Sequence, residues 1–313
     1  MQQPGGCDMI ISASRRTDIP ALYAEWFMNR IREGYVLTRN PMNRAQLSRL
    51  TLTPDTVDCI VFWTKDAANM LPCLDELDRR GYKYYFQFTL TPYGKELEPG
   101  LREKSGIEDT FITLSERIGK NCLVWRYDPV ILNETHDIKY HKTQFWRMCG
   151  KFSSYTDTVT VSFVDMYLKF KNVGSDIIRP LADDEIFELA AFIGATAKEF
   201  GLKAVACCEK YGLTPYGIEK SSCIDRRRIE KLLGCPLNIG ADKNQRPGCG
   251  CCESVDIGAY DTCTNGCVYC YANDGVIKSA RRRAAHDPLS GLLTGFVAEG
   301  ETIKEKQLKS NRI

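Results

Sequence analysis

Short apolar runs alternate with longer amphipathic segments along most of the chain. Runs of strand length lie at residues 9–12, 57–63, 82–90, 122–125, 158–164, 204–208 and 255–260. Segments with helical periodicity lie between them, at residues 20–34, 67–80, 108–119, 136–149 and 183–201. Two more short strands, at 35–38 and 46–52, predict a hairpin insertion. The alternation predicts an α/β fold with a parallel sheet, partly or fully closed into a TIM-like β/α barrel.

The predicted strands end in polar residues. Such residues follow six strands in succession: Arg15 and Asp18, Lys65 and Asp66, Gln87 and Thr89, Arg126 and Asp128, Ser162 and Asp165, and Glu209. Each one alone is explained as a loop residue that meets water. Because active sites of β/α barrels gather at the carboxyl ends of the strands, the whole set predicts a pocket there.

Composition narrows the classes of function. Hydrophobic residues make up 43% of the 313 residues, which is enough for a sizeable core. The net charge of +2 argues against a general electrostatic role on nucleic acid or a membrane surface. No apolar stretch approaches the ~18 residues that span a bilayer, and residues 1–9 do not form a signal peptide. We therefore expect a cytoplasmic protein with no membrane partner.

The chain has fifteen cysteines, an odd and large number. In a cytoplasmic protein such usage argues against a disulfide framework and for metal or redox chemistry. Cys59, Cys73, Cys122 and Cys149 stand singly in apolar surroundings and are expected to be buried, inert thiols. Apart from Cys7, the other ten all follow residue 200, and packing alone does not explain that crowding.

The sharpest motif is Cys263-x3-Cys267-x2-Cys270, directly after the last predicted strand. Three thiols at these spacings can converge in one tight loop, and thiolates are the ligands of iron–sulfur clusters. Three cysteines on a four-iron cluster leave one iron open to a ligand that is not protein. The alternative is a zinc site or a set of free thiols, although structural zinc normally takes four ligands.

This motif, with Tyr269 before its third cysteine, resembles the signature of the radical S-adenosylmethionine (SAM) superfamily. The chain is also similar to an uncharacterised family of bacterial and archaeal proteins whose C-terminal cysteines are similar to the radical-SAM motif. That similarity covers residues 12–18, 62–65, 125–129 and 256–273. The resemblance implies a 4Fe-4S cluster that holds SAM at its open iron, and reductive cleavage of SAM to a 5′-deoxyadenosyl radical.

The position of the motif near the C-terminus departs from the superfamily, where it usually lies near the N-terminus. The resemblance therefore implies a circularly permuted radical-SAM barrel, in which strand 255–260 lies beside strand 9–12. The superfamily's Gly-Gly-Glu-like segment is absent after Ser12. Residues in its place, together with the motif tyrosine, are the candidate SAM ligands: Ser12, Ser14, Arg15, Arg16, Asp18 and Tyr269. One of the arginines could hold the SAM carboxylate as a bidentate fork.

Candidate catalytic residues come from the polar strand ends. Arg126 and Asp128 are two apart on a strand and share a face, so they could bind the ribose of SAM or a charged substrate. A salt bridge at the rim of the barrel explains the same pair equally well. Glu209, after strand 204–208, completes the candidate set.

A second metal site is predicted from the remaining cysteines. Cys208, Cys223, Cys249 and Cys251 could hold an auxiliary iron–sulfur cluster, a second 4Fe-4S, with Cys252 as a substitute. Strand alternation predicts that Cys207 points into the core. A structural zinc ion, or no metal, remains open.

Three segments are expected: a barrel body at 1–210, a cysteine-rich segment at 211–254, and the last strand, cluster loop and C-terminal helix at 255–313, which form one unit with the body. The predicted protein is an oxygen-sensitive radical-SAM enzyme that acts on a small molecule or peptide and receives electrons from a flavodoxin or ferredoxin. The alternatives are a non-catalytic iron–sulfur or zinc protein, as electron carrier or binding module, and a DNA repair activity like that of spore photoproduct lyase. The near-neutral charge counts against nucleic acid.

Overall fold

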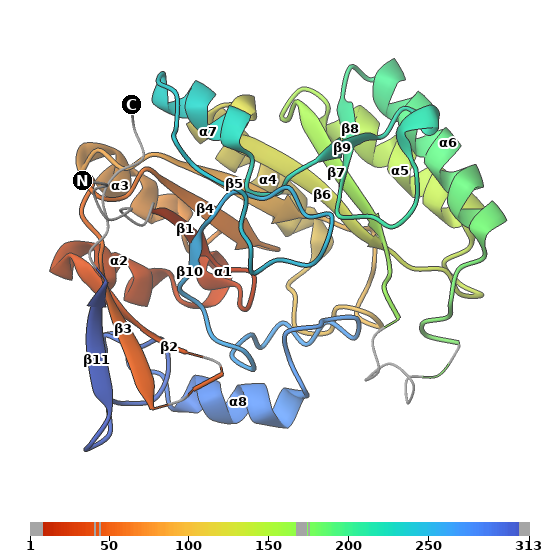
Figure 1. Ribbon diagram of the computed structural model, residues 1–313. Coiled ribbons are helices and arrows are strands. Elements are labelled where there is room, and N and C mark those ends of the chain that lie inside the picture. Colours follow the sequence, from red (N-terminus) through yellow and green to blue (C-terminus); the bar gives the residue numbers. More distant parts are fainter. Residues whose placement is uncertain (1–8, 41, 44, 167–173, 175, 307–313) are drawn as a thin grey trace.

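A parallel sheet of eight strands forms the centre of the protein (Figure 1). The computed structural model describes residues 9–40, 42–43, 45–166, 174 and 176–306. In spatial order the strands are β10 (Val255–Asp256), β1 (Ile10–Ala13), β4 (Cys59–Thr64), β5 (Tyr84–Thr89), β6 (Leu123–Val130), β7 (Thr158–Phe163), β8 (Lys203–Cys207) and β9 (Glu219–Ser221). All neighbouring pairs are parallel, which confirms the predicted α/β class.

The sheet is open. Its two edge strands, β9 and β10, have three and two residues and do not pair with each other in the described part of the chain. No closed barrel is therefore found among the described residues, and the closed form of the TIM-like prediction is not confirmed.

The predicted neighbour of the N-terminal strand is confirmed. Ile11 and Ser12 of β1 lie opposite Val255 and Asp256 of β10, although the two strands are more than 240 residues apart in sequence. The Asp256 carboxylate accepts hydrogen bonds from Ser12 Oγ at 2.9 Å and Ser14 Oγ at 2.6 Å. It also accepts from the backbone N–H of Arg15 at 2.8 Å. One side chain thus joins the start of the chain to the strand that precedes the cysteine loop.

Helices pack on one face of the sheet. They are α1 (Ile19–Leu22), α2 (Ala24–Glu33), α3 (Leu74–Arg79), α4 (Lys104–Ile118), α5 (Ile138–Phe152) and α6 (Asp183–Glu199), with short 3₁₀ turns at Leu71–Cys73, Lys120–Cys122 and Thr214–Tyr216. Aromatic side chains fill the main core beneath them; Phe62 of β4 contacts Phe27 of α2 and Phe86 of β5. The single helix predicted at 20–34 is two helices, which meet at Tyr23.

The other face of the sheet is covered by residues 222–252, which we call the cover segment. This segment contains α7 (Arg226–Leu233) and little other regular structure. Its apolar side chains, among them Ile224, Ile229 and Leu237, form a second core against Val61 and Tyr85 of the sheet. The sheet is therefore buried on both faces, and the sequence did not predict that the cysteine-rich segment covers one of them.

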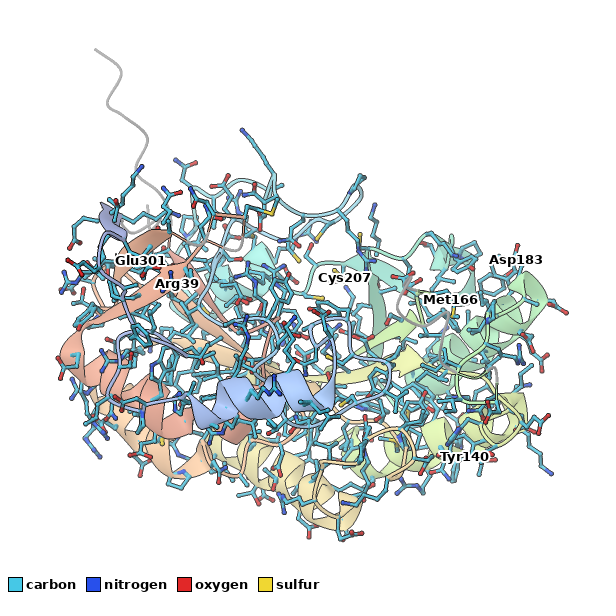
Figure 2. The ribbon with its side chains drawn as sticks, turned by 90° about the horizontal axis from the view of Figure 1, so that it is seen from below. Arg39, Tyr140, Met166, Asp183, Cys207 and Glu301 are labelled. Carbon is cyan, nitrogen blue, oxygen red and sulfur yellow. The ribbon has the colours of Figure 1, made fainter. Side chains whose placement is uncertain are left out.

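A small sheet stands beside the large one. β2 (Tyr35–Arg39) and β3 (Gln46–Thr51) form the predicted antiparallel hairpin, and β11 (Thr302–Lys306) adds a parallel strand to β3. Arg39 of β2 pairs with Glu301 just before β11, and Figure 2 shows these two side chains together. α8 (Val276–Ala284) carries the basic stretch of the sequence. None of the helices in the described ranges combines the length and hydropathy needed to cross a bilayer.

Candidate functional site

The cysteine loop, residues 263–270, follows β10 at the carboxyl edge of the sheet and is held by contacts with distant segments. The backbone N–H of Gly100 donates to the carbonyl of Asn265 at 2.9 Å, and Val268 N–H donates to the carbonyl of Leu97 at 3.0 Å. A Cβ on Gly100 would come within 2.6 Å of backbone oxygens in the loop, so the close approach requires glycine there. The loop is thus shaped by its neighbours as well as by its own sequence.

The three thiols of the loop lie near one another and are half-buried. Burial raises the pKa of Cys263, and negative charge on Cys267 or Cys270 would raise it further. Burial also raises the pKa of Cys267 to about 12. Among the described residues, however, the three sulfurs do not all lie within 4.8 Å of one another. This spread is compatible with a cluster in which each thiolate binds a different iron, because such thiolates stand further apart than those around a single ion.

Asp18 connects this loop to the first helix. Its carboxylate accepts from Ala21 N–H at 3.0 Å as the N-cap of α1, and from Thr64 Oγ at 2.7 Å and Lys65 N–H at 2.8 Å. It also accepts from Asn265 Nδ2 in the cysteine loop at 3.2 Å. Burial raises the pKa of Asp18 to about 6 despite these donors. Both oxygens are used, so the observed contacts give Asp18 a positioning role, and its binding of a ligand amino group stays a prediction.

Two lysines surround a buried carboxylate beside Cys267. The Glu98 side chain is fully buried and pairs with Lys65 at 2.7 Å and with Lys104. Tyr269 donates to Glu98 and accepts from Lys65 Nζ at 2.7 Å. The two ammonium groups outweigh the burial of Glu98 and lower its pKa to about 2, so the carboxylate is charged. Both lysines also interact electrostatically with Cys267, which places positive charge next to the cysteine loop.

The structure separates the roles of the two neighbouring arginines. Arg15 donates from its guanidinium to Ser254 Oγ at 3.0 Å and lies 3.9 Å from the Asp242 carboxylate. Arg16 lies over the ring of Tyr260 at 5.1 Å and has no acidic partner within the described ranges. Of the two predicted carboxylate ligands, Arg16 is therefore the one whose charge is not already matched.

Arg126 and Asp128 lie together on β6, as their spacing predicts. The Arg126 guanidinium contacts the Asp128 carboxylate, donates to Cys223 Sγ at 3.0 Å, and lies 5.2 Å from the ring centre of Trp63. Asp128 also accepts from the Ser162 hydroxyl. These contacts are those of the rim salt bridge that the sequence left as an equal alternative, and a role in substrate binding stays a prediction.

Glu209 follows β8, two strands further along the same edge. Its carboxylate accepts from the backbone N–H of Phe163 at 3.1 Å. Burial raises the pKa of Glu209 to about 7, and the nearby carboxylates of Asp165 and Asp128 raise it in the same direction. It can therefore exchange a proton near neutral pH, which is the property expected of a general acid or base.

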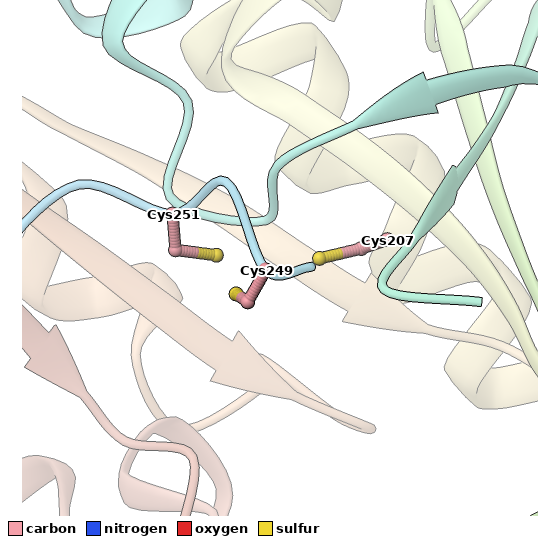
Figure 3. A group of neighbouring side chains, drawn as sticks. All are labelled: Cys207, Cys249 and Cys251. Carbon is pink, nitrogen blue, oxygen red and sulfur yellow. The ribbon is translucent and has the colours of Figure 1, made fainter. Parts of the chain in front are cut away.

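A second group of thiols lies at the end of β8. The sulfurs of Cys207, Cys249 and Cys251 all lie within 4.8 Å of one another and could hold a metal (Figure 3). Cys223 contacts Cys207 and Cys251 through side-chain hydrogen bonds. Three of the four predicted ligands are thus together, but Cys208 is replaced by Cys207, because Cys208 Sγ instead faces the carbonyl of Pro247 at 3.5 Å.

The correction at this position follows from the cover segment. Along β8 the alternation turns Ala204 and Ala206 toward the helices, and Cys207 toward the opposite face. The cover segment buries that face, so the side chain of Cys207 meets the cysteines of the cover segment there. Cys252, the predicted substitute ligand, is buried in the second core and forms an isolated β-bridge with Ala241.

Sequence reasoning missed the residues that hold the site together. Asp256 is the acceptor that fixes the polar residues after β1, and Glu98 is the acceptor that gathers the two lysines. Glu98 lies in a loop with several glycines and prolines, so no periodic pattern marked it. Asp256 is the second residue of a predicted strand, where a charged residue is rare, and this was the available signal.

Comparison with known protein families gives a match over most of the chain. A family model described as "Domain of unknown function (DUF1848)" matches residues 10–272, which include every strand of the large sheet and the whole cysteine loop. No curated protein matches the chain.

Proposed function

The chain belongs to the DUF1848 family, whose description assigns no activity, and we propose from the chemistry of its site that it is a radical-SAM enzyme. The observation that carries the proposal is the arrangement of Cys263, Cys267 and Cys270. They lie near one another in a loop that follows a strand of a parallel sheet, and they are spread more widely than the ligands of a single ion. When bound, a 4Fe-4S cluster and SAM would supply reductive cleavage to a 5′-deoxyadenosyl radical that abstracts hydrogen from a substrate.

The order of strands supports a permuted form of the radical-SAM barrel. The strand before the cysteine loop, β10, pairs with β1, and from there the sheet runs on through β4 to β8. The loop thus occupies the place that follows the first strand of a barrel, although it comes late in the sequence. The fold would be a partial barrel, since the sheet of the described residues is open.

The charged residues around the loop suit a cofactor with a negative cluster and a carboxylate. Lys65 and Lys104 would offset the negative charge of the thiolates, since both interact with Cys267. Arg16 would bind the SAM carboxylate, because its guanidinium has no acidic partner in the described part of the chain. Asp18 would keep the loop in place through Asn265.

Residues at the strand ends further along the sheet would bind the substrate and transfer protons to or from it. Glu209 would exchange a proton near neutral pH, and the pair Arg126–Asp128 would present a fixed charge arrangement to a polar small molecule or peptide. An electron donor such as a flavodoxin or ferredoxin would be needed to reduce the cluster.

The test is SAM cleavage by anaerobically purified protein. With dithionite and SAM, the wild-type protein is expected to yield 5′-deoxyadenosine, and the variant Cys263→Ala/Cys267→Ala/Cys270→Ala is expected to yield none. Iron and inorganic sulfide should fall together in that variant. Cys235→Ala is the matched control, because Cys235 lies in neither cysteine group.

Two outcomes would contradict the proposal. Protein that holds iron and sulfide yet leaves SAM intact would favour the non-catalytic electron carrier. Protein whose loop cysteines bind zinc, without iron or sulfide, would favour a zinc-stabilised binding module.

A further inference from the structure

The second cysteine group joins segments that are far apart in the sequence. Cys207 is the last residue of β8, Cys223 begins the cover segment, and Cys249 and Cys251 stand near its end. Figure 3 shows the sulfurs of Cys207, Cys249 and Cys251 turned toward one point between β8 and the cover segment. These thiols are free in the structure, although they lie close together.

The spacing of the sulfurs suits one metal ion. With Zn–S bonds of about 2.3 Å in a tetrahedron, the sulfurs stand about 3.8 Å apart. The sulfurs of Cys207, Cys249 and Cys251 all lie within 4.8 Å of one another, which is compatible with that geometry. The thiolates of a four-iron cluster bind different irons and must stand further apart, as do the sulfurs of the 263–270 loop.

Cys223 adjoins this group and is the candidate for a fourth ligand. Its thiol contacts those of Cys207 and Cys251, and its backbone carbonyl accepts from Tyr85 Oη and Gln87 Nε2, both at 2.7 Å. These two hydrogen bonds from β5 fix the backbone of Cys223 against the face of the sheet that the cover segment buries. Three thiols therefore lie within 4.8 Å of one another, and the thiol of Cys223 stands beside them in contact with two of the three.

Hydrogen-bond donors surround the group, as expected if its sulfurs are thiolates. Ile224 N–H donates to Cys251 Sγ at 3.4 Å, and the Arg126 guanidinium donates to Cys223 Sγ at 3.0 Å. Hydrogen bonds of this kind orient metal-bound thiolates and offset their charge. Gly250 packs closely against the start of the cover segment, since a Cβ there would lie 2.7 Å from Ser222 Oγ.

We propose that Cys207, Cys223, Cys249 and Cys251 form a tetrathiolate site for a single zinc ion, which fastens the cover segment to the end of β8. The cover segment has one helix of eight residues and an isolated bridge, so its own regular structure gives it little stability. Binding energy of a structural zinc ion adds directly to folding in such segments. Zinc also binds thiolates more tightly than ferrous iron does.

The experiment measures metal in full-length protein purified anaerobically. About one zinc per chain is expected, and it should remain in Cys263→Ala/Cys267→Ala/Cys270→Ala, where iron is lost. Each of the variants Cys207→Ser, Cys223→Ser, Cys249→Ser and Cys251→Ser should lower the zinc content at least tenfold. Cys208→Ser and Cys252→Ser are matched controls, since each changes a direct neighbour of a ligand, and both should keep the zinc.

A measurement on unmodified protein covers the case in which the serine variants fail to fold. Alkylation mapped by mass spectrometry should leave Cys207, Cys223, Cys249 and Cys251 unlabelled until a zinc chelator is added, and should then label all of them. Iron with sulfide that persists in the triple alanine variant would overturn the single-ion site in favour of a second cluster. A disulfide among these thiols, or labelling before chelation, would also overturn it. None of these readouts requires SAM cleavage.

Discussion

The two cysteine groups differ in how the chain brings them together. The loop group lies within eight consecutive residues and is shaped by hydrogen bonds from the loop at Leu97–Gly100. The second group is collected by the fold from three stretches of chain and lies between the sheet and the cover segment. One is widely spaced with lysines beside it, and the other is compact with an arginine against it. The difference teaches that spacing along the chain encodes the first group, whereas sheet topology encodes the second.

The largest expected effects come from removing one thiol of each group. Cys270→Ala should abolish formation of 5′-deoxyadenosine and change the free energy of unfolding little, because the loop is held by backbone contacts. Cys223→Ala should lower the free energy of unfolding by several kcal/mol, because the cover segment loses its metal ion. Urea unfolding beside the SAM assay measures both. Equal loss of stability in the two variants would remove the distinction between the groups.

A smaller loss is expected from Arg126→Met. This change leaves the Asp128 carboxylate without its ion partner and removes the donor to Cys223. Breaking one partner of such a largely buried pair costs about 3–5 kcal/mol. Urea unfolding should show this loss, and zinc should dissociate faster from the variant in a chelator assay. Arg147→Met is the control, since Arg147 pairs with Glu108 on the far side of the sheet at an exposed position. An unchanged zinc dissociation rate would show that Arg126 does not support metal binding by the second cysteine group.

Acid should lower the stability of the fold through His141, and it should release metal from the thiolates by a separate process. His141 is buried, with Tyr127 Oη at 2.8 Å from Nδ1 and the carbonyl of Ile131 at 2.8 Å from Nε2, and burial lowers its pKa to about 4. In the unfolded chain this histidine takes up its proton near pH 6.5. The contribution of neutral His141 to the free energy of unfolding is therefore fully present above pH 6.5 and is lost as the pH falls toward 4. The shift corresponds to about 3 kcal/mol.

His141→Gln offers a donor and an acceptor without a titrating proton, and should flatten unfolding free energy against pH in this range. Release of iron and zinc on acidification should keep its wild-type pH dependence. A pH profile of stability identical to that of the wild type would assign the acid sensitivity to other groups.

The smallest expected effect is that of Gly100→Ala. The new methyl group would press on backbone oxygens of the cysteine loop, and strain of this kind costs about 1–3 kcal/mol. Iron content and SAM cleavage should fall, whereas zinc content should not change. Gly119→Ala is an instructive control: it has open space around its Cβ but a φ of +85°, so it tests backbone strain away from both groups. If zinc fell together with iron in Gly100→Ala, the two groups would not be independent.

The strands from β1 to β8 of the large sheet could be predicted because each is an apolar run between polar ends, whereas the edge strand β9, with the sequence Glu-Lys-Ser, was not predicted. The place of strand 255–260 beside strand 9–12 could be predicted too, although β10 is only two residues long. The cover segment could not, since the three arginines at the start of α7 hide the single buried Ile229 in a polar stretch. β11 was missed for a similar reason: all its side chains are exposed, and charged residues occupy three of its five positions.

The parts of the candidate site that consist of residues close together in the sequence could be predicted. The loop cysteines and the pair Arg126–Asp128 depend on neighbours in sequence, and the structure brings each set together. The choice of Cys208 over Cys207 differs from the structure, in which Cys207 faces the cover segment and Cys208 Sγ faces the carbonyl of Pro247. Whether an inward residue meets the main core or a metal site depends on what covers each face, and that is a property of the whole chain.

The pairing of β10 with β1 has a consequence for biosynthesis. While the ribosome makes the protein, the outer edge of β1 has no partner until Val255 and Asp256 have emerged from the exit tunnel. The loop 263–270 follows only afterwards, so the sheet is completed and the three thiols are delivered in the same late step. A cluster bound by these thiols, as proposed above, could therefore be inserted only after nearly the whole chain has been translated.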